Sequence, residues 1–297
     1  MTRTSDVTGR TEAATTLQQS GVDDRTADPL LAALAAGVEA IDLAQPLANG
    51  MPCSPNHPGF RMVLSRRHGD MVRADGGSAA NEVIVTGGHV GTHIDALAHV
   101  SQDGLLHGGL DGAEAQTGGA FAVHGIDAVR PRLCHGVLLD VAALHGVQRL
   151  PGGYGITAED LAEAADRAKV RPRPGGVCLV NTGWSTLWSD PPGYLGLDSG
   201  VPGVTPDGAQ WLARHEIVAA GADTSAFEQV HPGRGHATLP VHRILLVEHG
   251  IHIIEHLRLG GLAARGLAEF AFVLAPLNIV GATGSPLRPL ALVSGAR

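Results

Sequence analysis

The sequence predicts an α/β fold in which strands and helices alternate along one domain. Short apolar runs at 136–141, 177–180 and 217–220 are each bounded by Gly or polar residues, as buried strands are. Segments with helical start signals lie between these runs. With 297 residues, the chain is long enough to bury the core of one large domain.

The N-terminal part is expected to begin with a mobile tail over 1–28, where no apolar periodicity is sustained. An Ala- and Leu-rich helix is expected at 29–38, followed by a strand that carries Asp42. Another strand is expected at 82–86. We therefore assign 29–297 to a single domain.

The second half of the chain carries clear helix boundaries. Thr157 followed by two acidic residues indicates an N-cap, and the helix is expected to run through Val170. Pro206 suits the first turn of a helix that runs through His215. Gly250 suits a left-handed C-terminal cap, which predicts a helix over 241–249.

The C-terminal part is expected to form strands at 251–257 and 268–274, with a short helix or turn at 260–266. The first of these strands would place Ile251, Ile253 and Glu255 on one face. A carboxylate in line with apolar neighbours should be partly buried, which is costly unless a cation compensates its charge. That cation could be a bound metal ion, or an arginine such as Arg243 or Arg258.

The composition excludes several classes of partner. A formal net charge of −8 and the lack of a basic run argue against nucleic acid and membrane surfaces, so a small-molecule partner is expected. Cys53, Cys134 and Cys178 are odd in number and show no C-x-x-C spacing, which favours neither a disulfide framework nor a thiolate zinc site. The N-terminal stretch lacks the apolar core of a signal peptide, so a cytoplasmic location is expected.

The most informative stretch is 89–99, which contains His89, His93, Asp95 and His99. Imidazole and carboxylate are ligands that Zn²⁺ and Mn²⁺ accept, and three protein ligands leave a position open for water. The stretch differs from the helical H-E-x-x-H signature, because Val90 and Gly91 follow the first histidine. The ligands are therefore expected on a loop at the end of a strand.

This stretch resembles the hallmark H-x-G-T-H-x-D-x-P-x-H of the cyclase-like metal-dependent amidohydrolases, a family that includes bacterial kynurenine formamidase and isatin hydrolase. Every polar position agrees, and the one departure is Leu97 in place of Pro. That departure leaves the metal ligands in place. Because it affects the stiffness of the loop and the shape of the pocket wall, it puts the identity of the substrate in doubt more than the reaction. Further segments are similar to the family at 41–52, 240–255 and 281–289.

The resemblance implies a swivelling β/β/α fold with a central barrel-like sheet. It implies that His89, His93 and Asp95 bind one ion, that Asp95, His242 and Glu255 bind a second where two are present, and that His99 transfers protons. The ion would be Zn or Mn, and the protein a homodimer or homotetramer. Trp184 would stack on an aromatic substrate, the alternative being a tryptophan that packs on its own loop. The other nearby histidines are expected to support the site or lie on the surface: His107, His249, His252 and His256.

The sequence favours one function and leaves three alternatives open. The favoured function is hydrolysis of an amide, lactam or lactone carbonyl by a metal-activated water, with His99 as the proton-transfer group. In the first alternative, a cyclase or dehydratase, the metal polarises a carbonyl without net addition of water. The second is a non-haem iron oxygenase with a two-histidine, one-carboxylate triad. The third is a non-catalytic module with a closed metal site.

Overall fold

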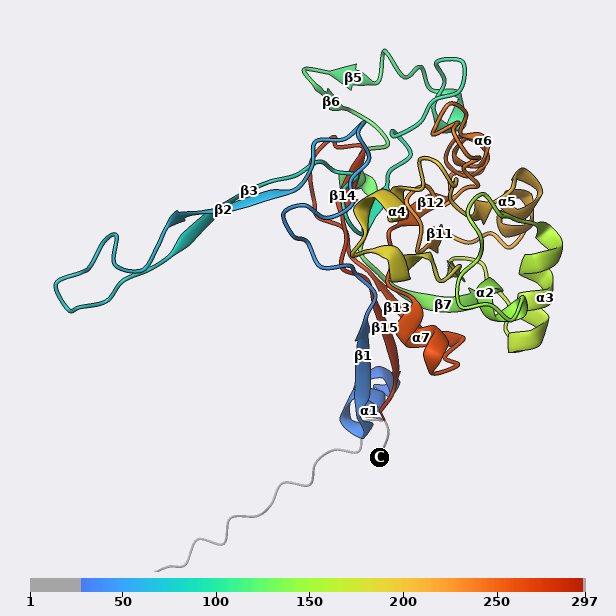
Figure 1. Cartoon of the computed structure of the whole chain (residues 1–297), viewed down its shortest axis with the longest axis horizontal. Helices are drawn as coiled ribbons and strands as arrows, with labels where there is room; N and C mark the ends of the chain where they lie inside the picture. The colour runs from blue at the N-terminus through green and yellow to red at the C-terminus, as the bar shows by residue number, and fades with distance from the viewer. Residues whose placement is uncertain (1–27, 296–297) are drawn as a thin grey trace, which may run out of the picture.

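The computed structural model describes residues 28–295, and its centre is a curled, half-barrel sheet of nine strands (Figure 1). The α/β class and the barrel-like sheet expected from the sequence are confirmed. The strands follow in the order β1 (Val38–Asp42), β15 (Leu290–Ser294), β13 (Glu269–Leu274), β7 (Arg132–Asp140), β9 (Val177–Asn181), β11 (Ala219–Ala222), β12 (His252–Glu255), β4 (His93–Asp95) and β14 (Gly284–Pro286).

The middle of the sheet is parallel and buried. Strands β7, β9, β11 and β12 run parallel to one another, and the remaining pairs are antiparallel. All of β9 and β11 is buried, as the short apolar runs predict for strands covered on both faces. At the end of this parallel group, β12 pairs with the antiparallel strand β4, and this pairing places Glu255 opposite His93.

Helices cover both faces of the sheet. One core cluster joins apolar residues of β7, β9 and β11 to those of α3 (Ala158–Ala168) and α5 (Pro206–Ala213). A second cluster lies on the opposite face under α7 (Gly260–Ala264). The shorter helices are α1 (Pro29–Ala36), α2 (Val141–Leu144), α4 (Pro191–Leu195) and α6 (Pro240–His242), with 3₁₀ turns at His107–Gly109, Ile126–Ala128 and Trp184–Leu187.

The helix expected over 241–249 is only partly α-helical. After α6, residues Arg243–Glu248 form a π-helical turn, in which His249 N–H donates to the carbonyl of Ile244. Gly250 follows with φ of 65°, the left-handed conformation expected for the residue after the helix. Single π turns inside helices are frequent at functional sites.

The strand expected near 82–86 exists, but it belongs to a projecting hairpin rather than to the core. Strands β2 (Arg61–Arg66) and β3 (Asn81–Val85) form an arm that leaves the body, and every residue of both strands is exposed (Figure 1). Two smaller pairs complete the strands: β5 (Gln116–Thr117) with β6 (Ala120–Phe121), and β8 (Gly155–Ile156) with β10 (Gly203–Val204).

The tail expected over 1–28 lies almost entirely outside the described residues, and the assignment of 29–297 to one domain stays a prediction. Among the helices within residues 28–295, none has both the length and the apolar character that a membrane crossing requires.

Candidate metal centre

The candidate site lies where β4, β12 and α6 meet. His93 and Asp95 share one face of β4, Glu255 ends the neighbouring β12, and His242 ends α6. The expectation of ligands on a loop holds for His89, which precedes β4 in a turn, and is wrong for His93 and Asp95, which lie on a buried strand. Strand pairing therefore fixes their positions better than a loop would.

Two carboxylates lie between two imidazoles. Nε2 of His93 is 3.5 Å from Oδ1 of Asp95 and 3.5 Å from Oε2 of Glu255. Nε2 of His242 is 3.7 Å from Oδ2 of Asp95 and 3.4 Å from Oε1 of Glu255. Donor atoms bound to one tetrahedral ion at its usual bond lengths lie about 3.3–3.5 Å apart. Each carboxylate thus offers one oxygen to each imidazole, at separations that suit one or two ions.

Two of these oxygens have no partner in the protein. Oδ2 of Asp95 and Oε1 of Glu255 are buried and accept no hydrogen bond from any described residue. Neither arginine considered for Glu255 compensates it, because Arg243 pairs with Glu248 and Arg258 lies nearest Asp42. Because buried carboxylate oxygens are costly without a cation or donor, the residues present fit a divalent metal ion.

Hydrogen bonds fix which ring nitrogen of each histidine faces the carboxylates. Nδ1 of His93 is 2.8 Å from the carbonyl of Gly91, and Nδ1 of His242 is 2.6 Å from Oε1 of Glu228. Carbonyl and carboxylate oxygens only accept, so both Nδ1 atoms donate and the two Nε2 atoms are the ones that would bind a metal. Gly91 makes the preceding turn possible, with φ of 67°.

The charges of the cluster are strongly coupled. Burial alone would raise the pKa of Asp95, but His99, His89 and His93 hold it well below its usual range. Burial alone would lower the pKa of His242, but the neighbouring carboxylates of Glu228 and Glu255 outweigh it and raise this pKa to about 10. The imidazole thus takes the positive charge that the carboxylates demand, which a metal ion would otherwise supply.

His89 and His99 lie beside this cluster rather than inside it. Nδ1 of His89 is 2.7 Å from Oδ1 of Asp95, and its Nε2 is 2.9 Å from the hydroxyl of Thr283. The ring of His99 stacks on His89 with centroids 3.8 Å apart. Burial lowers the pKa of His99 to about 3, well below the ordinary value of about 6.5 on which its expected role rested.

A cavity of about 220 Å³ opens onto the donors. Seven of its thirteen lining residues are histidines, including His57, His236 and His256. Such a lining favours a polar group, such as a carbonyl, over a purely apolar ligand. Leu97 does not line this cavity but packs against the core.

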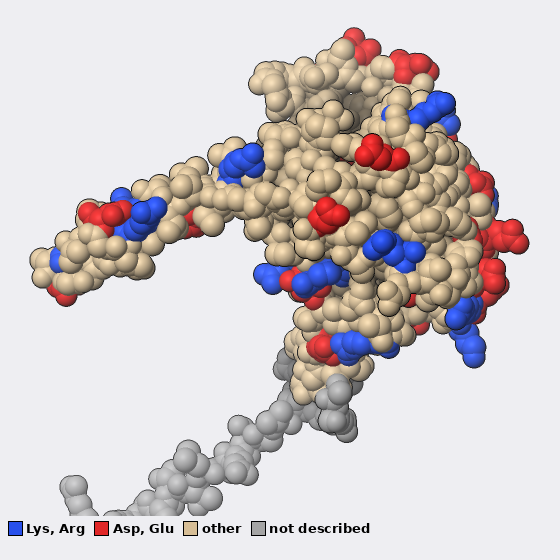
Figure 2. Space-filling view, in the orientation of Figure 1, with Lys and Arg blue, Asp and Glu red and all other residues tan. Residues whose placement is uncertain are grey.

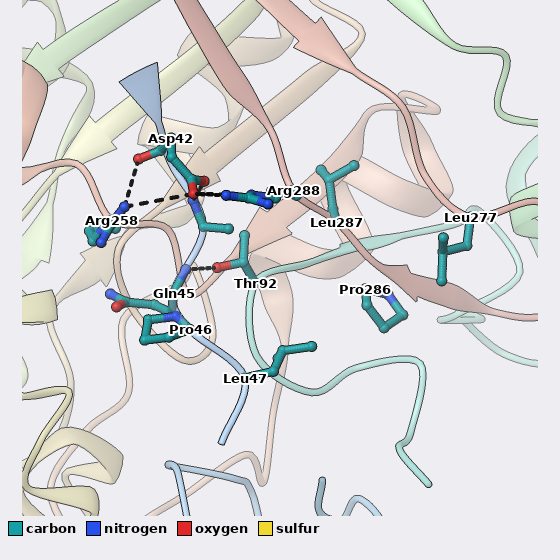
Figure 3. A pocket seen from close by; sticks show the side chains of 11 residues that line it. Asp42, Gln45, Pro46, Leu47, Thr92, Arg258, Leu277, Pro286, Leu287 and Arg288 are labelled. Carbon is teal, nitrogen blue, oxygen red and sulfur yellow. Dashed lines mark hydrogen bonds and ion pairs between the residues drawn. The ribbon is translucent and has the colours of Figure 1, made fainter. Parts of the chain in front are cut away.

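A larger pocket of about 410 Å³ lies near Thr92 (Figure 3). Its wall combines Leu47, Leu277 and Leu287 with the ion pair of Asp42 and Arg288. None of the metal-donor residues lines it. Thr92 connects it to the site, because its hydroxyl accepts from the backbone N–H of Gln45 and donates to the carbonyl of His256.

Trp184 does not line the donor cavity. Its side chain is buried, its Nε1 donates to the carbonyl of Tyr194, and it packs with Tyr194 and Val201 in a separate cluster. Sequence reasoning missed Glu228 and His57, and it treated His256 only as a supporting residue. No sequence motif marks Glu228, because its role depends on a hydrogen bond to His242, fourteen residues further along the chain.

Comparison with known proteins agrees with this architecture. Residues 41–229 match the family model Cyclase, described as "Putative cyclase". The chain belongs to the Cyclase family. The matched range contains His89, His93, Asp95 and His99, whereas His242 and Glu255 follow it.

Individual relatives of this Cyclase-family chain are also informative. A solved structure described as a novel cyclase is 30% identical, with a TM-score of 0.77 over 88% of this chain and 91% of that one. Isatin hydrolase of Roseibium aggregatum is 29% identical over 140 residues, which are 46% of this chain and 52% of that protein, so the match spans about half of that relative. Isatin hydrolase A from Ralstonia solanacearum shares the fold, with 23% identity and a TM-score of 0.69 over 89% of this chain and 96% of its own.

Proposed function

We propose that this Cyclase-family chain is a metal-dependent hydrolase that cleaves an amide, lactam or lactone carbonyl of a small molecule. The observation that carries the proposal is the pair of buried, unpartnered oxygens of Asp95 and Glu255 beside Nε2 of His242. The similarity to isatin hydrolase of Roseibium aggregatum supports the hydrolytic assignment. The cavity beside the donors leaves room for water and substrate.

His93, Asp95, His242 and Glu255 would hold the metal, one or two ions of Zn or Mn. Bound there, such an ion lowers the pKa of a water ligand from 15.7 to about 7 and polarises a carbonyl. Glu228 and the Gly91 carbonyl hold the two rings in the required tautomer. We propose His89 as a further ligand. To bind the metal, one of its ring nitrogens gives up its present hydrogen-bond partner, which is Asp95 for Nδ1 and Thr283 for Nε2.

His99 is proposed as the proton-transfer group. Burial lowers its pKa, so the ring is neutral at physiological pH and a ring nitrogen is available to take a proton from the attacking water and to return it to the leaving nitrogen or oxygen. Neither ring nitrogen is committed to another described residue, and the side chain lines the cavity.

The three alternatives differ in what they require. A cyclase or dehydratase would use the same residues, and product masses separate it from hydrolysis, which adds one water. Leu97 in place of Pro would favour this alternative if it reshaped the substrate pocket, but its side chain packs against the core, which weakens the argument. An iron oxygenase triad contains one carboxylate, whereas two lie between the imidazoles here. A closed metal module would not need the cavity that opens onto the donors.

The proposal is tested by metal analysis and a screen of formamides, lactams and lactones. The purified protein should contain Zn or Mn and lose activity when the metal is removed by chelation. His99→Ala should keep its metal and lose about 10²–10⁴-fold in kcat. His249→Ala, which removes an exposed histidine, is the control and should keep both. Full activity after verified metal loss would disprove the metal mechanism.

We also propose that the protein is a homo-oligomer, a dimer or tetramer, assembled through the β2–β3 arm. The arm exposes apolar side chains on both faces, with Val63 on one and Ile84 on the other, at 62% and 57% exposure. An isolated two-stranded hairpin is at best marginally stable in water, and apolar patches of this kind mark protein interfaces. A second copy of the chain would cover it.

A further inference from the structure

We propose that His256 is a third imidazole ligand of the metal, and that it works with His93 and Glu255. This inference rests on the proposed function and extends it to a residue outside the H-x-G-T-H-x-D stretch. One donor atom of each of these three residues lies within 4.8 Å of the other two. All three residues are buried, and all three line the cavity.

The backbone of His256 is held in a conformation that histidine adopts only when its surroundings impose it. Its φ is 55°, in the left-handed region. The N–H donates to the carbonyl of Thr224, and the carbonyl accepts from the hydroxyl of Thr92, at 2.9 and 2.6 Å. Thr92 belongs to the same stretch as His93 and Asp95, so one segment sets the position of both histidines.

Tyr194 fixes the ring of His256 in one tautomer. The Tyr194 hydroxyl has a single proton, which it donates to the carbonyl of Asp223 at 3.2 Å. The same oxygen lies 3.0 Å from Nδ1 of His256 and accepts from it in the tautomer that satisfies both contacts. Nδ1 then carries the proton and Nε2 keeps its lone pair, which meets no hydrogen-bond donor among residues 28–295.

This is the arrangement found at the other two imidazoles. Nδ1 donates to Gly91 in His93, to Glu228 in His242 and to Tyr194 in His256, and in each ring Nε2 remains available. The ring of His256 is further held between Tyr194, stacked at 5.5 Å, and Trp188, edge-on at 5.8 Å. An imidazole that is neutral, oriented and buried beside a carboxylate is prepared for a metal ion.

The test is a titration of the metal-free full-length protein with Co²⁺ alone, followed by visible d–d absorption and by calorimetry. His256→Asn should change the shape and intensity of the spectrum and weaken Co²⁺ binding at least about tenfold. Asn tolerates the left-handed backbone better than His, so the fold should be retained. Tyr194→Phe, which removes the hydroxyl that contacts Nδ1 of His256 and the carbonyl of Asp223, should give a smaller change in the same direction.

The matched control is His124→Asn. His124 also has a positive φ, of 62°, but it lies outside the cavity, and its variant should bind Co²⁺ like the wild type. If the wild type binds Co²⁺ while His256→Asn gives the wild-type spectrum and affinity, His256 is not a ligand and the hydrolase proposal stands. If the wild type binds no Co²⁺, Zn²⁺ or Mn²⁺, both proposals fail.

Discussion

His242 shows how strongly the site depends on one buried pair. Glu228 accepts from Nδ1 of His242 at 2.6 Å and from its backbone N–H at 3.1 Å, so a single carboxylate orients both the ring and the backbone of α6. The backbone N–H of Val241 adds a third donor at 3.3 Å. The carboxylate thus orients the lone pair of His242 and increases its basicity.

Glu228→Gln should weaken metal binding about 10–100-fold, because the amide retains the shape but loses the charge that supports the imidazole. Equilibrium dialysis with metal analysis measures this change. Glu248→Gln, which removes a half-exposed ion pair with Arg243, serves as the control and should bind metal normally. Equal affinities in both variants would show that Glu228 has no part in holding the metal.

The sequence predicts part of this site and omits the rest for a physical reason. His89, His93, Asp95 and His99 lie within eleven residues, where spacing alone indicates metal chemistry. The structure brings His242 and Glu255 to the same cluster, as the family resemblance implied. Glu228 and His256 act through tertiary hydrogen bonds, and neither spacing nor periodicity reports such contacts.

Helix α3 is stabilised at its start by a compact polar network. Thr157 and Asp160 form a capping box, in which each side chain accepts from the backbone N–H of the other. The Asp160 carboxylate also accepts from His145 and Tyr154, at 2.8 and 3.2 Å. Burial alone would raise the pKa of Asp160, but the hydrogen bonds of Thr157 and His145 outweigh it and lower this pKa.

Asp160→Ala should destabilise the protein by about 1–2 kcal/mol, because it leaves the helix start and two side chains without their acceptor. Urea unfolding followed by circular dichroism measures the loss, with the exposed Glu163→Ala as the control. Since the pKa is lowered in the folded state, the stabilisation is present above the unfolded pKa and is lost as the pH falls through the folded pKa. A difference that persists undiminished in acid would contradict this account.

Regular elements were predicted well where local signals are strong. The helix from Thr157 and the helix from Thr205 carry caps or proline at their first turns, and both form as expected. The π-helical turn at Arg243–Glu248 was not predictable, because its hydrogen bonds depend on how the segment packs beside the site. The strand at 82–86 forms as expected, but its place in an exposed hairpin was not predicted, because an apolar strand pattern does not report whether other chain segments cover it.

The molecule combines a packed body with one uncovered projection. Figure 2 shows charged side chains of both signs scattered over the visible face of the body and along the arm, where they gather towards the tip. The arm is rooted beside the site, since His57 precedes β2 and His89 follows β3, and both line the cavity. Docking of the arm on another copy would thus restrain two walls of the cavity.

Val63→Glu combined with Ile84→Glu should shift the protein to a smaller species, because the charges would be desolvated on both faces of the arm. Light scattering after size-exclusion chromatography measures the mass. Val280→Glu, at a site 78% exposed and outside the arm, should leave the mass unchanged. A wild-type protein that is monomeric at micromolar concentration would overturn the proposed assembly.

The pairing of β12 with β4 sets the composition of the metal centre. Glu255 faces His93 across the ladder, while Ile253 and Ile254 enter opposite apolar clusters. Both faces of β12 are apolar, so hydrophobicity alone scarcely distinguishes the native register from a register displaced by one residue. The displaced register would nevertheless turn the side chain of Glu255 away from the metal-donor cluster. Deleting one residue from this strand should therefore remove Glu255 from the metal centre while the apolar faces of the strand stay buried, so the length of this segment matters to the site as well as the identity of its side chains.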